Sequence, residues 1–205
     1  MTDEVYVQTT TAEWVELLGM ALLFTENPRS GRVPREQLQH VLFHERRGVL
    51  RLTASDGFGL IELTTSIPAP ADLRRMYHRA DLELAVKLLR AAPKGTVARL
   101  EDDALRVYGA TEQRVELTPW HGTDFPSYEA VIPIVRPTTT LRSAFGAGAD
   151  QLARLAKVGA RAGRGGQVRI QPGGNPTQPI RCDFDNATWE AVVVLQPMVV
   201  AEWTT

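Results

Sequence analysis

A repeated supersecondary pattern limits the possible folds of this chain more than any other sequence feature. An amphipathic helical pattern begins near Thr11, near Arg79 and near Gly148, at intervals of roughly 70 residues, and three short strand-like segments follow each one. The apolar positions follow the i, i+3, i+4 spacing of one helix face: Trp14, Leu17, Leu18, Ala21 and Leu22; Leu82, Ala85, Val86 and Leu89; Leu152, Leu155 and Ala156. Because a helix with a small antiparallel meander cannot bury its apolar faces alone, paired units predict a two-layer α+β domain.

The strand-like segments and the linkers predict how the units are arranged. The expected strands are 38–44, 49–53 and 60–65, then 96–100, 104–109 and 114–118, then 167–171, 180–185 and 190–195. The run Arg46-Arg47-Gly48 and the pair Asp102-Asp103 are interpreted as hairpin turns. We expect a complete two-unit domain over residues 1–135, with units 1–68 and 69–135, and a lone third unit over 136–205.

Composition predicts a cytoplasmic protein without a membrane span. The longest apolar run, Ala191 to Leu195, is too short to cross a bilayer, and no charged and apolar leader opens the sequence. Net charge is −1, which argues against a generic polyanion binder. The one cysteine, Cys182, fits a reducing compartment and is interpreted as a small buried apolar residue.

Catalytic and cofactor signatures are weak. His40 and His44 have metal-like i, i+4 spacing, but they fall in a strand-like run, so no metal site is expected. Gly146-Ala-Gly148 precedes a helix without the lysine of a phosphate-binding loop. No Ser-His-Asp grouping can be placed, so we expect neither an enzyme nor a cofactor. An enzyme acting on a small molecule on an unrelated α+β scaffold is the least favoured alternative.

Three short motifs lie at residues 54–60, 125–128 and 195–198. They resemble motifs of sliding clamps of the DNA polymerase III beta subunit type, with a PCNA-like build of repeated units. Ala54-Ser-Asp-Gly-Phe-Gly-Leu60 resembles the Ala-Thr-Asp-Gly-His-Arg-Leu run of the bacterial middle domain, with Phe58 and Gly59 replacing His and Arg. Phe125-Pro-Ser-Tyr128, followed by Val131-Ile-Pro133, resembles the end of that domain. Leu195-Gln-Pro-Met198 keeps the Pro-Met pair of the clamp C-terminus. The resemblance implies a shortened DNA-clamp fold.

The resemblance also implies a non-catalytic processivity or docking factor of DNA replication. Clamp helices face duplex DNA and contact its phosphates, without sequence preference, through Lys and Arg. The corresponding residues here are Arg74, Arg75, Arg79, Lys87, Arg90, Lys94, Arg154, Lys157, Arg161 and Arg164. The first helix departs from this pattern, since it carries Glu13, Glu16 and Glu26.

A second implied surface is the groove that receives short peptides from a DNA polymerase or other clamp-binding proteins. By motif match its residues are Ser55, Gly57, Phe58, Leu60, Pro133, Val194, Gln196, Pro197 and Met198. Methionine, proline and aliphatic side chains form an adaptable apolar socket for linear motifs. The alternative interpretation of these residues is a buried strand with Met198 as a core residue.

The number of units bears on assembly and on the alternative function. Three units leave one unit whose helix and sheet edge need a partner, so we expect self-association or assembly with a second clamp-like chain. The alternative is a clamp-fold modulator or decoy of a replisome that binds proteins and never encircles DNA. The acidic first helix and the near-zero net charge favour that alternative.

Overall fold

A computed structural model describes residues 6–27, 33, 35–101, 103–133, 147–162, 168–171 and 178–197. The helices are α1 (Thr11–Ala21), α2 (Arg79–Ala91) and α3 (Ala149–Ala162), with short 3-10 turns η2 (Glu36–Gln39) and η3 (Glu129–Val131). The strands are β1 (Val7–Thr10), β2 (His40–Arg46), β3 (Val49–Ser55), β4 (Gly59–Pro68), β5 (Arg74–His78), β6 (Val97–Glu101), β7 (Ala104–Tyr108), β8 (Glu112–Glu116), β9 (Arg169–Gln171), β10 (Ile180–Asp185) and β11 (Trp189–Leu195). The predicted α+β class is confirmed.

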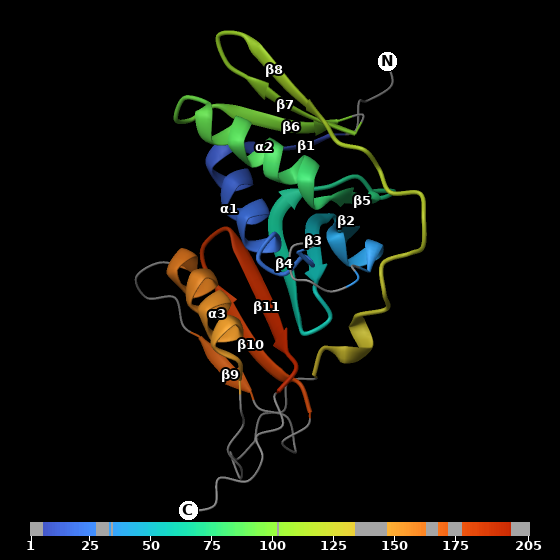
Figure 1. Cartoon of the computed structure of the whole chain (residues 1–205). Helices are drawn as coiled ribbons and strands as arrows, with labels where there is room; N and C mark the ends of the chain where they lie inside the picture. Colours follow the sequence, from blue (N-terminus) through green and yellow to red (C-terminus); the bar gives the residue numbers. More distant parts are fainter. Residues whose placement is uncertain are drawn as a thin grey trace, which may run out of the picture.

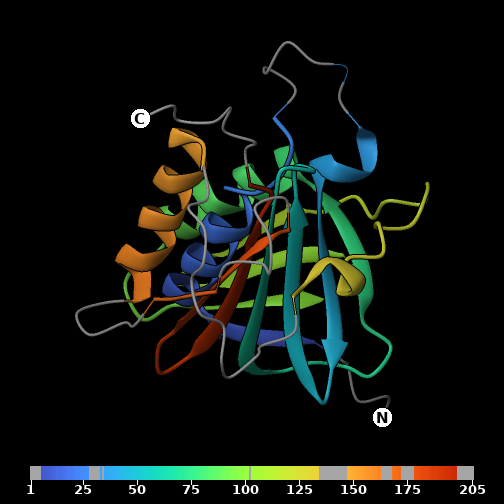
Figure 2. The ribbon, with the colours of Figure 1, turned by 90° about the horizontal axis from the view of Figure 1, so that it is seen from below.

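Two antiparallel sheets carry the helices on one side (Figure 1). The four-stranded sheet has the order β1-β6-β7-β8, and the seven-stranded sheet has the order β5-β2-β3-β4-β11-β10-β9. The third unit joins the first through antiparallel pairing of β11 with β4, with Val194 opposite Leu60. Figure 2 shows α3 on one side of the seven-stranded sheet and the segment that contains η3 on the other.

Each of the first two helices is preceded directly by a strand that the sequence analysis did not anticipate. β1 leads into α1 but pairs with β6, while β5 leads into α2 but pairs with β2. The two units thus exchange their first strands and close each other's sheets. Arg74 and Arg75, which the sequence analysis assigned to DNA, lie on strand β5 and not on a helix.

Helix ends are satisfied by local and long-range hydrogen bonds. The Thr10 hydroxyl accepts from the Glu13 N–H at 3.2 Å and caps α1, and the His78 ring nitrogen Nδ1 accepts from the Ala80 N–H at 3.1 Å and caps α2. At the other end of α1, the Arg79 guanidinium donates to the Leu22 carbonyl at 3.1 Å. Such bonds supply partners to groups that helix termini leave unsatisfied.

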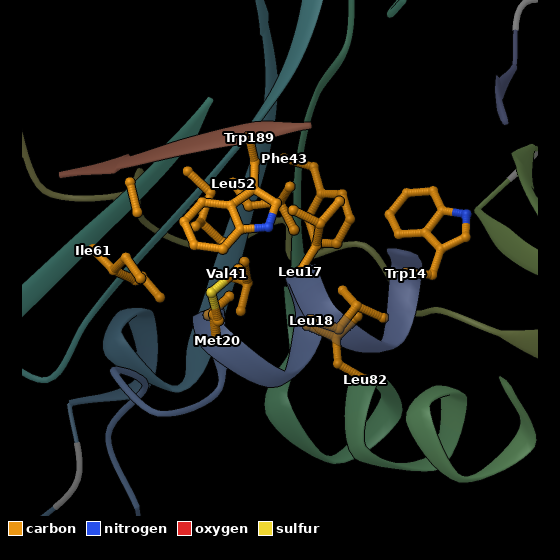
Figure 3. Close-up of a cluster of buried hydrophobic side chains, with 14 of the residues drawn as sticks. Trp14, Leu17, Leu18, Met20, Val41, Phe43, Leu52, Ile61, Leu82 and Trp189 are labelled. Atoms are coloured by element: carbon orange, nitrogen blue, oxygen red, sulfur yellow. The ribbon is translucent and has the colours of Figure 1, made fainter. Parts of the chain in front are cut away.

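The main core lies between the helices and both sheets, and Figure 3 shows its centre around α1. Trp14, Leu17 and Leu18 of α1 are fully buried, and the Trp14 indole N–H donates to the Ala98 carbonyl of β6 at 3.2 Å. Truncating a buried leucine of this kind to alanine costs about 2–5 kcal/mol. Cys182 is also fully buried, as expected, and burial raises the pKa of its thiol to about 11.

A second cluster covers the opposite face of the seven-stranded sheet. It consists of Leu42, Leu60, Met76, Phe125, Tyr128 and Val194 and is called the outer cluster below. The Phe125-Pro-Ser-Tyr128 motif therefore crosses the back of the sheet, on which Leu60 of β4 and Val194 of β11 lie side by side.

Candidate functional site at the junction of β4 and β11

The Asp-Gly turn between β3 and β4 is held by its own polar side chains. One Asp56 carboxylate oxygen accepts from the N–H groups of Phe58 and Gly59, at 2.9 and 2.8 Å. The Ser55 hydroxyl donates to the Gly59 carbonyl at 2.9 Å. Gly57 has φ +81°, a backbone region that L side chains rarely adopt, so the turn depends on glycine there.

The end of β11 is anchored to this turn. The Gln196 N–H donates to the Phe58 carbonyl at 2.9 Å. From the start of α3, the Gln151 side-chain amide donates to the carbonyls of Phe58 and Gln196, at 3.3 and 3.1 Å. Three segments far apart in sequence therefore meet around one backbone carbonyl.

The structure brings the predicted groove residues 55–60 and 194–197 together, with different exposures. Gly57, Phe58 and Gln196 are exposed, Ser55 and Pro133 are half-buried, and Leu60, Val194 and Pro197 are buried. Met198 lies outside the described residues. Pro133 is connected to the third unit, because its carbonyl accepts from the Arg181 guanidinium of β10 at 3.0 Å. Among these described residues, the exposed large apolar one is Phe58, which is 48% exposed.

An ionic network positions the turn from behind. Arg154 of α3 pairs with the second carboxylate oxygen of Asp56, and its guanidinium lies 5.8 Å from the centre of the Phe24 ring. Arg35 donates to the Asp56 carbonyl at 2.7 Å, and its backbone N–H donates to the Glu26 carboxylate at 2.7 Å. Since Asp56 is buried, the Arg154 ion pair and the two backbone N–H groups of the turn compensate the cost of removing its charge from water.

Sequence reasoning missed these positioning residues. Asp56 was part of the recognised motif but was not assigned a role, and Arg154 was assigned to DNA. Gln151 and Arg35 carried no signal at all, because their partners lie far away in the chain. An aspartate directly before a turn glycine is the one local sign that could have indicated the cap.

A buried polar network connects the outer cluster to the sheet. The Tyr128 hydroxyl donates to the Glu62 carboxylate at 2.8 Å and lies 3.2 Å from the His44 ring nitrogen Nε2. Glu62 also pairs with Arg51 at 2.9 Å. Burial lowers the pKa of His44 below its ordinary value of 6.5, which favours the neutral ring. Burial and the neighbouring Glu62 raise the pKa of Tyr128 to about 12, so its hydroxyl stays protonated.

The basic residues assigned to DNA fall into two groups. The exposed ones are Arg74, Arg75, Lys87, Arg90, Lys94 and Lys157. The others make contacts within the chain: Arg79 caps α1 and pairs with Glu83 at 2.7 Å, Arg154 pairs with Asp56, and Arg161 lies against Gly19 of α1. Arg164 lies outside the described residues. The acidic side chains of α1 also have local roles, since Glu16 accepts from the Trp189 indole N–H at 3.0 Å.

His40 and His44 both lie on β2, as predicted, and both are buried. The His40 ring packs against the rings of His78 and Trp120, with centres 5.1 and 4.7 Å away. Within the described residues, no group of three or more His, Cys, Asp and Glu side chains could hold a metal ion. No helix in the described part of the chain is long and apolar enough to span a membrane.

The fold is that of the DNA sliding clamps, and comparison with solved structures shows this over nearly the whole chain. Neither a protein-family model nor a curated protein matches the sequence. The Bartonella birtlesii DNA polymerase III beta subunit clamp, solved bound to griselimycin, is similar with a TM-score of 0.67 and 17% identity over 96% of this chain. A Pseudomonas aeruginosa DNA polymerase sliding clamp gives a TM-score of 0.69 at 14% identity over 96% of this chain.

The length covered differs between the two kinds of clamp. The match spans 66% of each of these two bacterial clamp chains. The A. fulgidus PCNA, solved with the C-terminal region of FEN-1, is covered over its whole length, with a TM-score of 0.60 and 11% identity over 97% of this chain. At identities this low, the structural similarity shows that the chain shares its fold with both kinds of clamp.

Proposed function

We propose that this chain is a non-catalytic, clamp-like docking factor of DNA replication. In this proposal, the junction of β4 and β11 binds short peptide segments of a DNA polymerase or another client protein. The exposed Lys and Arg of the helical side contact the phosphates of duplex DNA. In the same proposal, residues 1–135 form a complete clamp-like domain and residues 136–205 form a third unit.

The convergence of the Asp-Gly turn, the end of β11 and the start of α3 around the Phe58 carbonyl carries the proposal. The motif at residues 54–60 and the motif that begins at Leu195 therefore lie in contact, in addition to resembling clamp motifs in sequence. A rigid hydrogen-bonded rim beside an exposed aromatic side chain suits the binding of an extended peptide. Phe58 supplies an aromatic anchor, the residue type that dominates binding energy in interfaces.

A library of random linear peptides displayed on phage tests the docking function. Peptides selected on the wild-type chain are expected to lose about 2 kcal/mol of binding free energy, or roughly thirtyfold in Kd, in Phe58→Ser. The matched control is Leu84→Ser, which changes a similarly exposed apolar side chain on α2. Failure to select any peptide, or equal binding to the wild type and Phe58→Ser, would contradict the docking function.

DNA binding is tested separately with a fluorescent duplex of mixed sequence. Lys87 and Arg90 are exposed on α2, so the double variant Lys87→Glu, Arg90→Glu should weaken binding and reduce the slope of log K against log salt by about 2. The control variant Arg46→Glu, Arg47→Glu makes the same change of charge at the β2–β3 turn. An equal effect of the two double variants would count against a DNA-facing role of α2.

The alternative, a clamp-fold modulator that binds proteins without encircling DNA, is also favoured by one structural observation. Arg79, Arg154 and Arg161 are engaged within the chain, which leaves fewer cations for phosphates. This alternative would be favoured if Phe58→Ser weakens peptide binding while the Lys87→Glu, Arg90→Glu double variant binds duplex DNA like the wild type.

A further inference from the structure

The segment of residues 117–133, which we call the strap, leaves the end of β8 and crosses the back of the seven-stranded sheet (Figure 1). At its start it is tied to strand β5, because the Trp120 N–H donates to the Met76 carbonyl at 2.8 Å. Farther along, the side chains of Phe125 and Tyr128 pack in the outer cluster together with Met76. Side-chain contacts of this kind, more than a strand ladder, hold the strap on the sheet.

Two buried histidines lie beneath the strap. His40, Leu42 and His44 are alternate residues of β2, so their side chains lie on the face of the sheet that carries the outer cluster. The centres of the His40 and Trp120 rings are 4.7 Å apart, and His44 Nε2 lies 3.2 Å from the Tyr128 hydroxyl. His40 is 4% exposed and His44 is 7% exposed. The strap therefore covers one histidine with Trp120 and the other with Tyr128.

The hydrogen bonds of both rings fit the neutral form. His40 Nδ1 lies 2.8 Å from the Glu36 carbonyl oxygen, and because a carbonyl only accepts, this nitrogen carries the ring proton. The Tyr128 hydroxyl donates its proton to Glu62, so its contact with His44 places the ring proton of His44 on Nε2. A second proton would go to the other nitrogen of each ring and create a charge at a position that water does not reach.

The charged groups around His44 do not offset its burial. Glu62 of β4 and Glu129 of η3 favour a charged ring, whereas Arg51 of β3 and Arg74 of β5 oppose it. Burial is the largest effect, and it lowers the pKa of His44 below its ordinary value of 6.5.

The surroundings of His40 act in the same direction. Glu36 of η2 and Asp81 of α2 favour a charged ring, His78 of β5 opposes it, and burial is again the largest effect and lowers the pKa of His40 below 6.5. When the strap lifts, water reaches both rings and they bind protons more readily. The attached strap, whose histidines bind fewer protons, therefore loses stability relative to the lifted strap as pH falls below about 6.5.

We propose that the strap is a proton-operated cover, which detaches from the back of the seven-stranded sheet when His40 and His44 are protonated and so uncovers the outer cluster. The main core stays folded, because it lies on the other face of this sheet. Each histidine raises the ratio of detached to attached strap by at most about tenfold per pH unit, so the two together give at most about a hundredfold. This device goes beyond the docking function proposed above and does not require it.

Methyl NMR of the methionines in the full chain distinguishes release of the strap from unfolding. Met76 belongs to the outer cluster beneath the strap, whereas Met20 is fully buried in the main core. A soluble paramagnetic agent increases the relaxation of those methyl groups that the solvent reaches. From about pH 7.5 to about pH 5.5, we expect the relaxation of the Met76 methyl group to rise at least about threefold and that of Met20 to stay unchanged.

Two substitutions retain the hydrogen-bond donors of the neutral rings and remove their titration. The amide in His40→Asn can donate in place of Nδ1, and the amide in His44→Gln can donate in place of Nε2. In the double variant, the Met76 methyl group should stay protected at about pH 5.5. The matched control is His121→Gln, which removes an exposed histidine of the strap itself and should leave the response of Met76 to pH unchanged.

Three results would overturn the proposal. These are a Met76 methyl group that stays protected at about pH 5.5 in the wild type, a response to pH that persists in the double variant, and relaxation of Met20 that rises together with that of Met76. If the double variant does not fold, the wild type alone decides. The ring signals of His40 and His44 must then titrate over the same pH range as the response of Met76, and a response while both rings remain neutral would refute the device.

Discussion

Replacing Tyr128 with phenylalanine tests how the motif on the back of the sheet is held in place. The Tyr128 hydroxyl donates to the Glu62 carboxylate at 2.8 Å, and the other oxygen of that carboxylate pairs with Arg51 at 2.9 Å. Glu62 is only 8% exposed. Tyr128→Phe therefore removes one hydrogen bond from a buried carboxylate while the aromatic ring stays in the outer cluster, 6.0 Å from the Phe125 ring.

The structure sets the expected magnitude. Since the ring keeps its packing, the loss comes from a buried acceptor without its partner, which costs about 1–3 kcal/mol. For a chain of this size, a loss of about 2 kcal/mol lowers Tm by roughly 4–8 °C. The neighbouring His44 ring also loses its contact with the hydroxyl, which places the expected loss above that of an exposed hydrogen bond.

Urea unfolding, followed by tryptophan fluorescence, measures the free energy of unfolding of the wild type, of Tyr128→Phe and of a control variant. The control is Tyr108→Phe, which removes a hydroxyl that donates to Glu101 at 2.9 Å from a side chain that is 38% exposed. Exposed substitutions of this kind stay within about 0.5 kcal/mol of the wild type. If Tyr128→Phe costs no more than Tyr108→Phe, the reasoning about the buried network is refuted.

Two further predictions concern the same region. Burial holds the pKa of His44 below 6.5, so the unfolded chain binds more protons at mildly acidic pH, and the contribution of His44 to stability is lost as pH falls below about 6.5; an NMR titration of the ring that gives 6.5 or higher would contradict this. Gly57→Ala should destabilise more than Gly48→Ala in the same urea assay. Both glycines have φ near +80°, which costs alanine about 1–2 kcal/mol, but a Cβ at Gly57 would lie 2.3 Å from the Arg35 guanidinium and nothing lies within 4 Å at Gly48; equal losses would show that the Arg35 contact has no weight.

Local sequence patterns predicted the start of a helix and the position of a turn. The helix expected from Thr11 begins there and ends at Ala21, and the expected turn at Arg47 and Gly48 has positive φ at both residues. These features depend on residues a few positions apart, through apolar periodicity and turn conformation. The strands β1 and β5 were missed. β1 is a short polar stretch and β5 opens with two arginines, so neither has a strand pattern of its own, and each becomes a strand by pairing with a strand of the other unit.

In the candidate site, too, local features could be predicted from the sequence and long-range contacts could not. The Asp-Gly turn and its glycine could be recognised in the sequence, because the cap from Asp56 reaches only two and three residues ahead. The role of Arg154 could not, because an arginine on an amphipathic helix has the same pattern whether it faces DNA, water or an aspartate 98 residues away. Only the tertiary structure decides between these partners.

The sequence by itself determined the repeated units, their helices and turns, and the motifs that resemble sliding clamps, since these follow from interactions between neighbours in the chain. The tertiary structure decided which strands the units exchange and which basic residues stay exposed. These properties follow from contacts between residues far apart in sequence, which have no local signature, and a buried charge is defined only by those contacts.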